Sequence, residues 1–176
     1  ATSLAVSATF VPIGGSTSQG AVYVFDDVPP NGWRQQARVF DPGGQAFDEF
    51  GRAIAASGDT LLIGVPGADP FGVVRVYLRT GTSWSLQATL LPGSADGGTP
   101  AFGTSVALWN DTAVAGAPEF EAAEGEARVF QRTRVANGGA CSLGGECLSG
   151  FCVDGVCCDT ACGGGVVDCQ ACSPAA

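Results

Sequence analysis

The sequence contains no histidine, no methionine and no lysine, and these absences exclude several kinds of chemistry. Without histidine the chain cannot build a Ser-His-Asp or Cys-His catalytic group or a histidine-ligated metal site. Without lysine it cannot form the lysine-bearing glycine loop that binds nucleotide phosphates. Acidic pairs such as Asp26 and Asp27 are sequence neighbours in predicted loops, whereas glycosidase carboxylates face each other across a cleft. We therefore predict a protein that is not an enzyme and holds no cofactor.

Positive charge is also scarce. Eight basic residues, all arginine, stand against 17 acidic ones, which gives a net charge of −9. Such a chain repels nucleic acid and anionic lipid, because both attract clustered Lys and Arg. The sequence has no run of about 18 apolar residues, so we predict no membrane span. Reliance on arginine alone is typical of GC-rich bacterial genomes.

Cysteine is missing from the first 140 residues and then becomes dense. An even number of closely spaced cysteines indicates an oxidising compartment and a disulfide framework. A zinc site is the alternative, but four-cysteine zinc sites usually need two C-x2-C pairs and only one is present. We predict a disulfide-stapled tail over residues 137–176, and the spacing leaves the pairing open. The cysteines predicted to form disulfides are Cys141, Cys147, Cys152, Cys157, Cys158, Cys162, Cys169 and Cys172.

An internal repeat occupies the rest of the chain. Phe50 and Gly51 recur as Phe102 and Gly103, a period of 52 residues. Each pair precedes the same series of short apolar segments separated by turn residues, which predicts β-strands joined by tight turns. A similar series fits the first 50 residues, although without the phenylalanine. The predicted strands are 2–7, 11–14, 20–25 and 33–40 in the first copy, 52–57, 61–66, 72–77 and 84–91 in the second, and 104–109, 113–118 and 125–130 in the third.

Four short strands in each repeat of about 50 residues are typical of a β-propeller blade. The predicted fold is all-β, with blades at residues 1–49, 50–101 and 102–136, the last without its outer strand. The recurring glycines mark close backbone approaches, and the recurring aromatic residues are best explained by packing between blades. These structural motif residues are Trp33, Phe50, Gly51, Gly64, Pro66, Trp84, Phe102, Gly103, Gly116 and Pro118.

These motifs resemble FG-GAP repeats, which also occur in the head of integrin α subunits. Trp33 and Trp84, each followed by a Gln-Ala pair, resemble the bacterial subtype of that repeat. The resemblance implies a propeller of about seven blades when complete. Many such blades carry a calcium loop, but only Asp59 and Asp111, each after a Gly or Asn, occupy that position here, so we predict no metal. Loop carboxylates at Asp41, Asp48 and Glu49 leave an ion site as an alternative to ordinary surface charge.

The tail, including residues 149–158, resembles cysteine-rich segments near the C-termini of bacterial surface proteins. Together the two resemblances imply an extracellular or cell-surface protein. The leading hypothesis is a binding or adhesion module that recognises a protein or a glycan. The alternative is a structural subunit of an extracellular filament that joins other copies of itself, because three blades leave two apolar faces open. In that alternative, residues 1–7 or the tail of a neighbouring chain would complete the third blade by strand donation.

Overall fold

A computed structural model describes residues 2–68, 70–92, 101–120, 124–133, 151–153 and 156–158. The chain forms two compact units, Ala1–Gln131 and Arg132–Ala176. The described elements of both units are antiparallel β-strands, which confirms the predicted all-β class.

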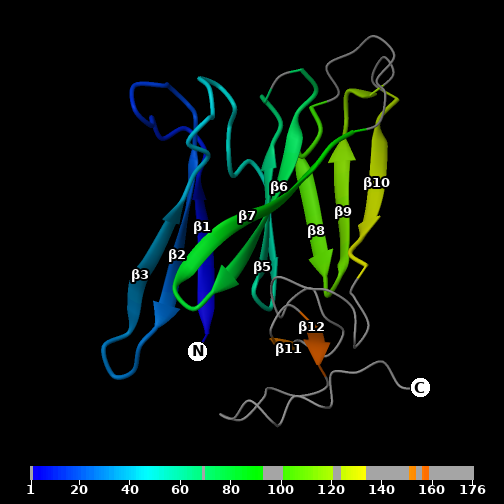
Figure 1. Cartoon of the computed structure of the whole chain (residues 1–176). Helices are drawn as coiled ribbons and strands as arrows, with labels where there is room; N and C mark the ends of the chain where they lie inside the picture. The colour runs from blue at the N-terminus through cyan, green and yellow to red at the C-terminus, as the bar shows by residue number, and fades with distance from the viewer. Residues whose placement is uncertain are drawn as a thin grey trace, which may run out of the picture. The chain divides into compact units, whose positions relative to one another are not determined.

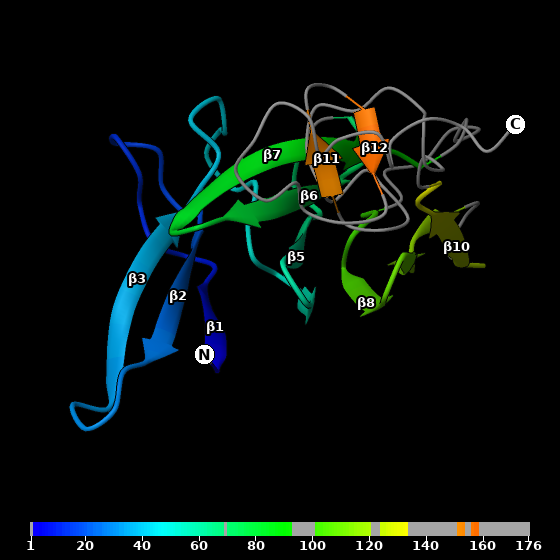
Figure 2. The ribbon, with the colours of Figure 1, turned by 60° about the horizontal axis from the view of Figure 1, so that its bottom comes forward.

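The first unit contains three sheets that follow one another along the chain (Figure 1). The first sheet has the strand order β1-β2-β3, the second β4-β5-β6-β7 and the third β10-β9-β8. The sheets lie in series, and Figure 2 shows the same succession from a second direction. The strands are β1 (Ser3–Ala8), β2 (Ala21–Asp27), β3 (Trp33–Val39), β4 (Ile54–Ser57), β5 (Thr60–Val65), β6 (Val73–Thr80), β7 (Ser83–Leu90), β8 (Ser105–Trp109), β9 (Thr112–Ala117) and β10 (Glu126–Gln131).

Two apolar clusters hold these sheets together. Because side chains alternate across a strand, β5 supplies residues to both clusters. Leu61, Ile63 and Val65 pack toward the first sheet, with Val22 and Val24. Leu62 packs toward the third sheet, with Ala113 and the other small residues of β9. The strand β5 is therefore buried on both faces, which explains its apolar run from Leu61 to Val65.

The strand assignment predicted for the first copy is wrong. Residues 2–7 were expected to match the first strand of the later copies, and residues 11–14 the second. Instead β1 pairs directly with β2, as β5 does with β6, so β1 is the counterpart of the second strand. Residues 11–14 form no strand, and Ile13 makes only an isolated bridge with Ser16. Pro12 and the two glycines that follow favour turns over a paired strand, and they lengthen this loop relative to residues 66–72.

In the second unit the described strands are two short paired ones, β11 (Phe151–Val153) and β12 (Val156–Cys158). Cys152 lies opposite Cys157 in this pair. Cys158 is the last residue of β12, and all other cysteines of the chain lie outside the described residues. The predicted disulfides therefore stay a prediction.

Candidate functional site

The junction between consecutive sheets is built twice in the same way. Phe50 and Phe102 are both fully buried. The backbone N–H of Phe50 donates to the Gln19 carbonyl at 2.8 Å, and that of Phe102 donates to the Phe71 carbonyl at 3.0 Å. The Phe50 ring meets the Tyr77 ring edge-on at 6.1 Å, and Phe102 meets Phe130 at 6.0 Å. Each phenylalanine thus anchors a new sheet on the preceding one.

Glycines make this close approach possible. Gly72 has a φ of +78°, and a Cβ placed on it would lie 2.5 Å from the Phe102 carbonyl oxygen. Gly51 and Gly103 also have positive φ, and their N–H groups donate to the carbonyls of Gly64 and Gly116 at 3.0 Å. Only glycine combines this backbone conformation with so little space.

The remaining predicted motif residues differ in their surroundings. Trp84 is half-buried and packs against the first core cluster, whereas Trp33 is 51% exposed. Pro66 is half-buried and Pro118 is exposed. Packing therefore explains Phe50, Phe102 and Trp84 better than it explains Trp33.

The loop carboxylates considered for an ion are engaged with protein groups. Asp41 pairs with Arg75 at 2.6 Å and accepts a hydrogen bond from the Gly43 N–H. Buried Asp48 accepts from the Gln45 N–H at 2.7 Å, and Glu49 lies 3.6 Å from Arg52. Among the residues that the structure describes, no group of three or more acidic, histidine or cysteine side chains is arranged to hold a metal.

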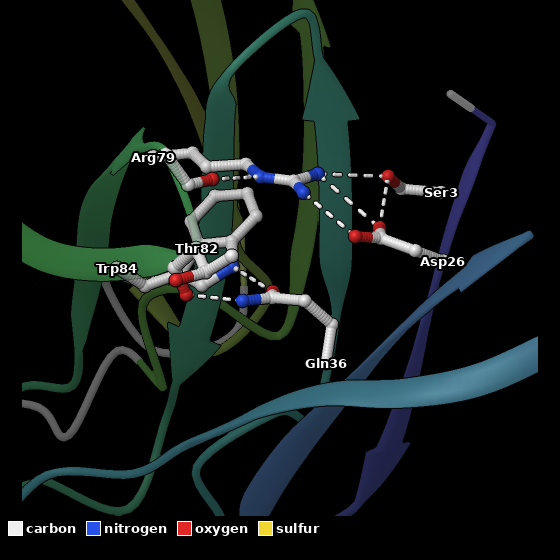
Figure 3. A network of polar contacts seen from close by, with 7 residues as sticks. Ser3, Asp26, Gln36, Arg79, Thr82 and Trp84 are labelled. Atoms are coloured by element: carbon white, nitrogen blue, oxygen red, sulfur yellow. Dashed lines mark hydrogen bonds and ion pairs between the residues drawn. The ribbon is translucent and has the colours of Figure 1, made fainter. Parts of the chain in front are cut away.

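A polar network links the first two sheets (Figure 3). Arg79 donates to both carboxylate oxygens of Asp26, at 2.7 and 3.3 Å, and to the Ser3 hydroxyl at 2.9 Å. The Ser3 hydroxyl in turn donates to Asp26 at 2.6 Å. The hydrogen bond from Ser3, followed by those from Arg79, holds the pKa of Asp26 below its ordinary value.

The same network continues through the outer strands. The Arg79 guanidinium lies over the Trp84 ring at 6.0 Å, and the Trp84 Nε1 donates to Gln36 at 3.1 Å. Gln36 also donates to the Thr82 carbonyl. These contacts tie β3 of the first sheet to the β6–β7 hairpin of the second. This network could not be predicted from the sequence, because its partners lie far apart along the chain.

A cleft of about 390 Å³ lies beside this network. Its lining combines β1 with the β4–β5 turn and with the side chains of the network. The lining residues are Ser3, Leu4, Ala5, Val24, Ala56, Gly58, Asp59, Leu61, Arg79 and Trp84.

A second candidate surface is the face of the third sheet that points away from the second sheet. Ala107, Val114 and Val129 form one row across its three strands. Trp109 is 77% exposed and Val129 is 68% exposed. Within the first unit, no described strand covers this face, whereas the corresponding face of the second sheet buries Leu62 and Val74 almost completely. An apolar face of this kind is a candidate contact surface.

The described part of the chain has no helix long and apolar enough to cross a membrane.

The family model of the FG-GAP repeat matches residues 33–77, which run from β3 into β6 and include the first Phe-Gly pair. No curated protein matches the chain.

Proposed function

We propose that this protein is a non-catalytic adhesion module, extracellular or on a bacterial cell surface, that binds another protein. Proteins with FG-GAP repeats are generally extracellular or surface-exposed, generally non-catalytic, and typically mediate protein binding. The acidic charge of the chain agrees with a partner that is neither nucleic acid nor an anionic membrane.

The observation that carries this proposal is the open apolar face of the third sheet. Protein interfaces are enriched in aromatic residues, and tryptophan is prominent among the side chains that dominate binding energy. Trp109 and Val129 provide such side chains on a face that no described strand of the first unit covers. A glycan is the second candidate partner, because Thr112 and Gln131 lie in the same row of the sheet as Trp109.

The first prediction concerns Trp109. The purified chain is tested by biolayer interferometry against a panel of extracellular-matrix proteins and against immobilised glycans. We expect saturable binding to a protein, weakened at least about tenfold by Trp109→Ser, because a buried interface tryptophan typically contributes about 2 kcal/mol or more. Phe10→Ser is the matched control, since Phe10 is 64% exposed in a loop of the first sheet.

Three results would contradict the proposal: binding to glycans alone, equal binding by wild type and Trp109→Ser, or equal losses in both variants. Light scattering on the same samples tests the alternative of a self-assembling filament subunit. That alternative is favoured by the same exposed side chains, Trp109 and Val129, on the third sheet. If the mass rises with concentration in wild type but not in Trp109→Ser, self-assembly becomes the favoured function in place of adhesion.

A further inference from the structure

The loop between β2 and β3 is short and largely exposed (Figure 1). It comprises residues 28–32, with the sequence Val-Pro-Pro-Asn-Gly. Two backbone hydrogen bonds close it: the Val28 N–H donates to the Gly32 carbonyl at 3.0 Å, and the Asn31 N–H donates to the Val28 carbonyl at 2.7 Å. The backbone of the loop is therefore held in place, while Asn31 is exposed to water.

Asn31 is followed by Gly32, and glycine is the neighbour that most favours deamidation of an asparagine. In this reaction the backbone nitrogen of the next residue attacks the side-chain amide carbon, Cγ, and a side chain on that next residue would crowd the attack. Glycine has no side chain, and its backbone reaches conformations closed to other residues. There is room around Gly32 as well: its φ is +72°, and a Cβ placed on it would meet no heavy atom within 4 Å beyond its chain neighbours.

The two reacting groups have no partner within the part of the chain that the structure describes. No described group accepts a hydrogen bond from the Gly32 N–H, and the Asn31 side chain forms no hydrogen bond. That side chain can therefore rotate among its staggered positions and bring Cγ to the Gly32 nitrogen. Asn110 differs, because Asp111 follows it and its own N–H donates to the Ser57 hydroxyl at 3.2 Å.

We propose that Asn31 is a site of spontaneous deamidation, with water as the only co-reactant. The Gly32 nitrogen loses its proton to hydroxide and bonds to Cγ of Asn31, the bond from Cγ to Nδ2 breaks, and ammonia leaves after taking a proton from water. The product is a five-membered succinimide ring that joins the two residues. Water then opens the ring: cleavage of the bond from Cγ to the ring nitrogen gives aspartate, and cleavage at the Asn31 backbone carbonyl gives isoaspartate. Overall one water enters and one ammonia leaves, so nothing is oxidised or reduced.

Deamidation changes the charge and the backbone of this loop. Both products carry a new carboxylate, which changes the net charge of the chain from −9 to −10. In isoaspartate the main chain runs through Cβ and Cγ and is one methylene longer. The hydrogen bond from Val28 to Gly32 spans this insertion and is disturbed by it. The site lies in the first sheet and is distinct from the exposed face of the third, so it goes beyond the proposed function.

The test follows the full chain during incubation at neutral pH, with samples digested by trypsin and measured by liquid chromatography and mass spectrometry. Asn31 is the only asparagine of the tryptic peptide 1–34, and Asn110 is the only one of the peptide 80–128, so each site is measured separately. A synthetic peptide with the sequence of residues 26–36 gives the rate without a fold. We expect Asn31 in the chain to react at least about tenfold faster than Asn110 and within about tenfold of the peptide, because the folded loop withholds neither reacting group.

Three readouts distinguish this route from direct hydrolysis of the side-chain amide. Electron-transfer fragmentation should find both isoaspartate and aspartate at position 31, whereas direct hydrolysis gives aspartate alone. The rate should rise about tenfold for each pH unit near neutrality, because the Gly32 nitrogen must first lose its proton. Asn31→Gln is the matched control and should abolish the mass gain in peptide 1–34, because glutamine would have to form a larger ring.

Three results would overturn the proposal. The first is a rate at Asn31 in the folded chain more than about tenfold below that of the peptide, which would show that the loop protects the site. The second is an equal rate at Asn31 and Asn110, and the third is aspartate as the sole product.

Discussion

At the scale of single residues, the contact that most clearly links the first two sheets is the pairing of Arg79 with Asp26. Both side chains are largely buried, with exposed fractions of 17% and 16%. The geometry is bidentate, which is the stronger arrangement for an arginine and a carboxylate. Ser3 adds a hydrogen bond to the same carboxylate.

This geometry gives a pH-dependent prediction. Asp26→Asn should lower the free energy of unfolding at neutral pH by about 1.5–3 kcal/mol, the usual range for hydrogen bonds to charged groups. Because the folded-state pKa of Asp26 lies below the ordinary value of 3.8, the wild type has this stability above that value and loses it as the pH falls through the folded-state pKa. Urea unfolding at a series of pH values should therefore show the two proteins converging in acid.

Ser3→Ala is the companion variant, because the Ser3 hydroxyl is the largest cause of the lowered pKa. An NMR titration of the Asp26 carboxyl carbon should show its pKa moving up toward 3.8 in this variant. An unchanged pKa in Ser3→Ala, or a difference in stability that persists undiminished in acid, would argue against this description of the pair.

Residues of the Phe-Gly junction show the limits of reasoning from sequence. The pairs themselves, and the need for close backbone approach, could be recognised from their recurrence. The conformation of the preceding residues could not: Glu49 and Ala101 have φ of +57° and +50°. Non-glycine residues rarely adopt this region, so nothing in their identity indicates it. Both residues lie in turns, since the N–H of Arg52 donates to the Glu49 carbonyl and that of Thr104 to the Ala101 carbonyl.

At the scale of strands, the second and third copies were predictable because turn residues bound each segment closely. The predicted strand 61–66 corresponds to β5 at Thr60–Val65, and 113–118 corresponds to β9 at Thr112–Ala117. The first copy was misaligned because residues 9–20 form a longer loop than residues 66–72. Gly20 is the feature that fixes the alignment, since it lies at the start of β2 as Gly72 lies at the start of β6.

The outer strands carry a matched pair of tryptophans with different surroundings. Trp84→Ala should lower the free energy of unfolding by about 2–3 kcal/mol, because Trp84 packs on the first core cluster, lies beneath Arg79 and donates to Gln36. Trp33→Ala should cost less than about 1 kcal/mol, because half of Trp33 is exposed. Urea unfolding of the two variants measures the difference. Equal losses would mean that the shared sequence motif, and not the local contacts, decides how much each tryptophan contributes to the free energy of unfolding.

At the scale of the whole molecule, composition could predict an all-β chain with an acidic surface, a repeat region and a separate cysteine-rich tail. The division into Ala1–Gln131 and Arg132–Ala176 falls close to the change in composition. The candidate surfaces were harder to predict from the sequence. Open faces follow from having few blades, but the network of Ser3, Asp26 and Arg79 depends on residues brought together only by folding, since Asp26 and Arg79 are 53 positions apart.

One repeated junction, in which a Phe-Gly pair packs on a glycine of the preceding sheet, joins consecutive sheets. The third sheet has Gly125 at the position equivalent to Gly72, and no described Phe-Gly pair packs on it. Gly72 and Gly125 make a controlled comparison, because both have a φ of +78°. A Cβ on Gly72 would meet the Phe102 backbone, whereas among the described residues the nearest heavy atom to a Cβ on Gly125 is the Pro118 carbonyl oxygen at 3.5 Å.

The most direct measurement is the free energy of unfolding of Gly72→Ala and Gly125→Ala, obtained from urea titrations followed by tryptophan fluorescence. Both variants carry the same backbone strain, about 1–2 kcal/mol for an L-residue in this region. The account predicts that Gly72→Ala loses at least about 2 kcal/mol more, because the Phe102 backbone must move away. Equal losses in the two variants would contradict it, since they would show that the Phe-Gly junction adds nothing to the stability of the stacked sheets.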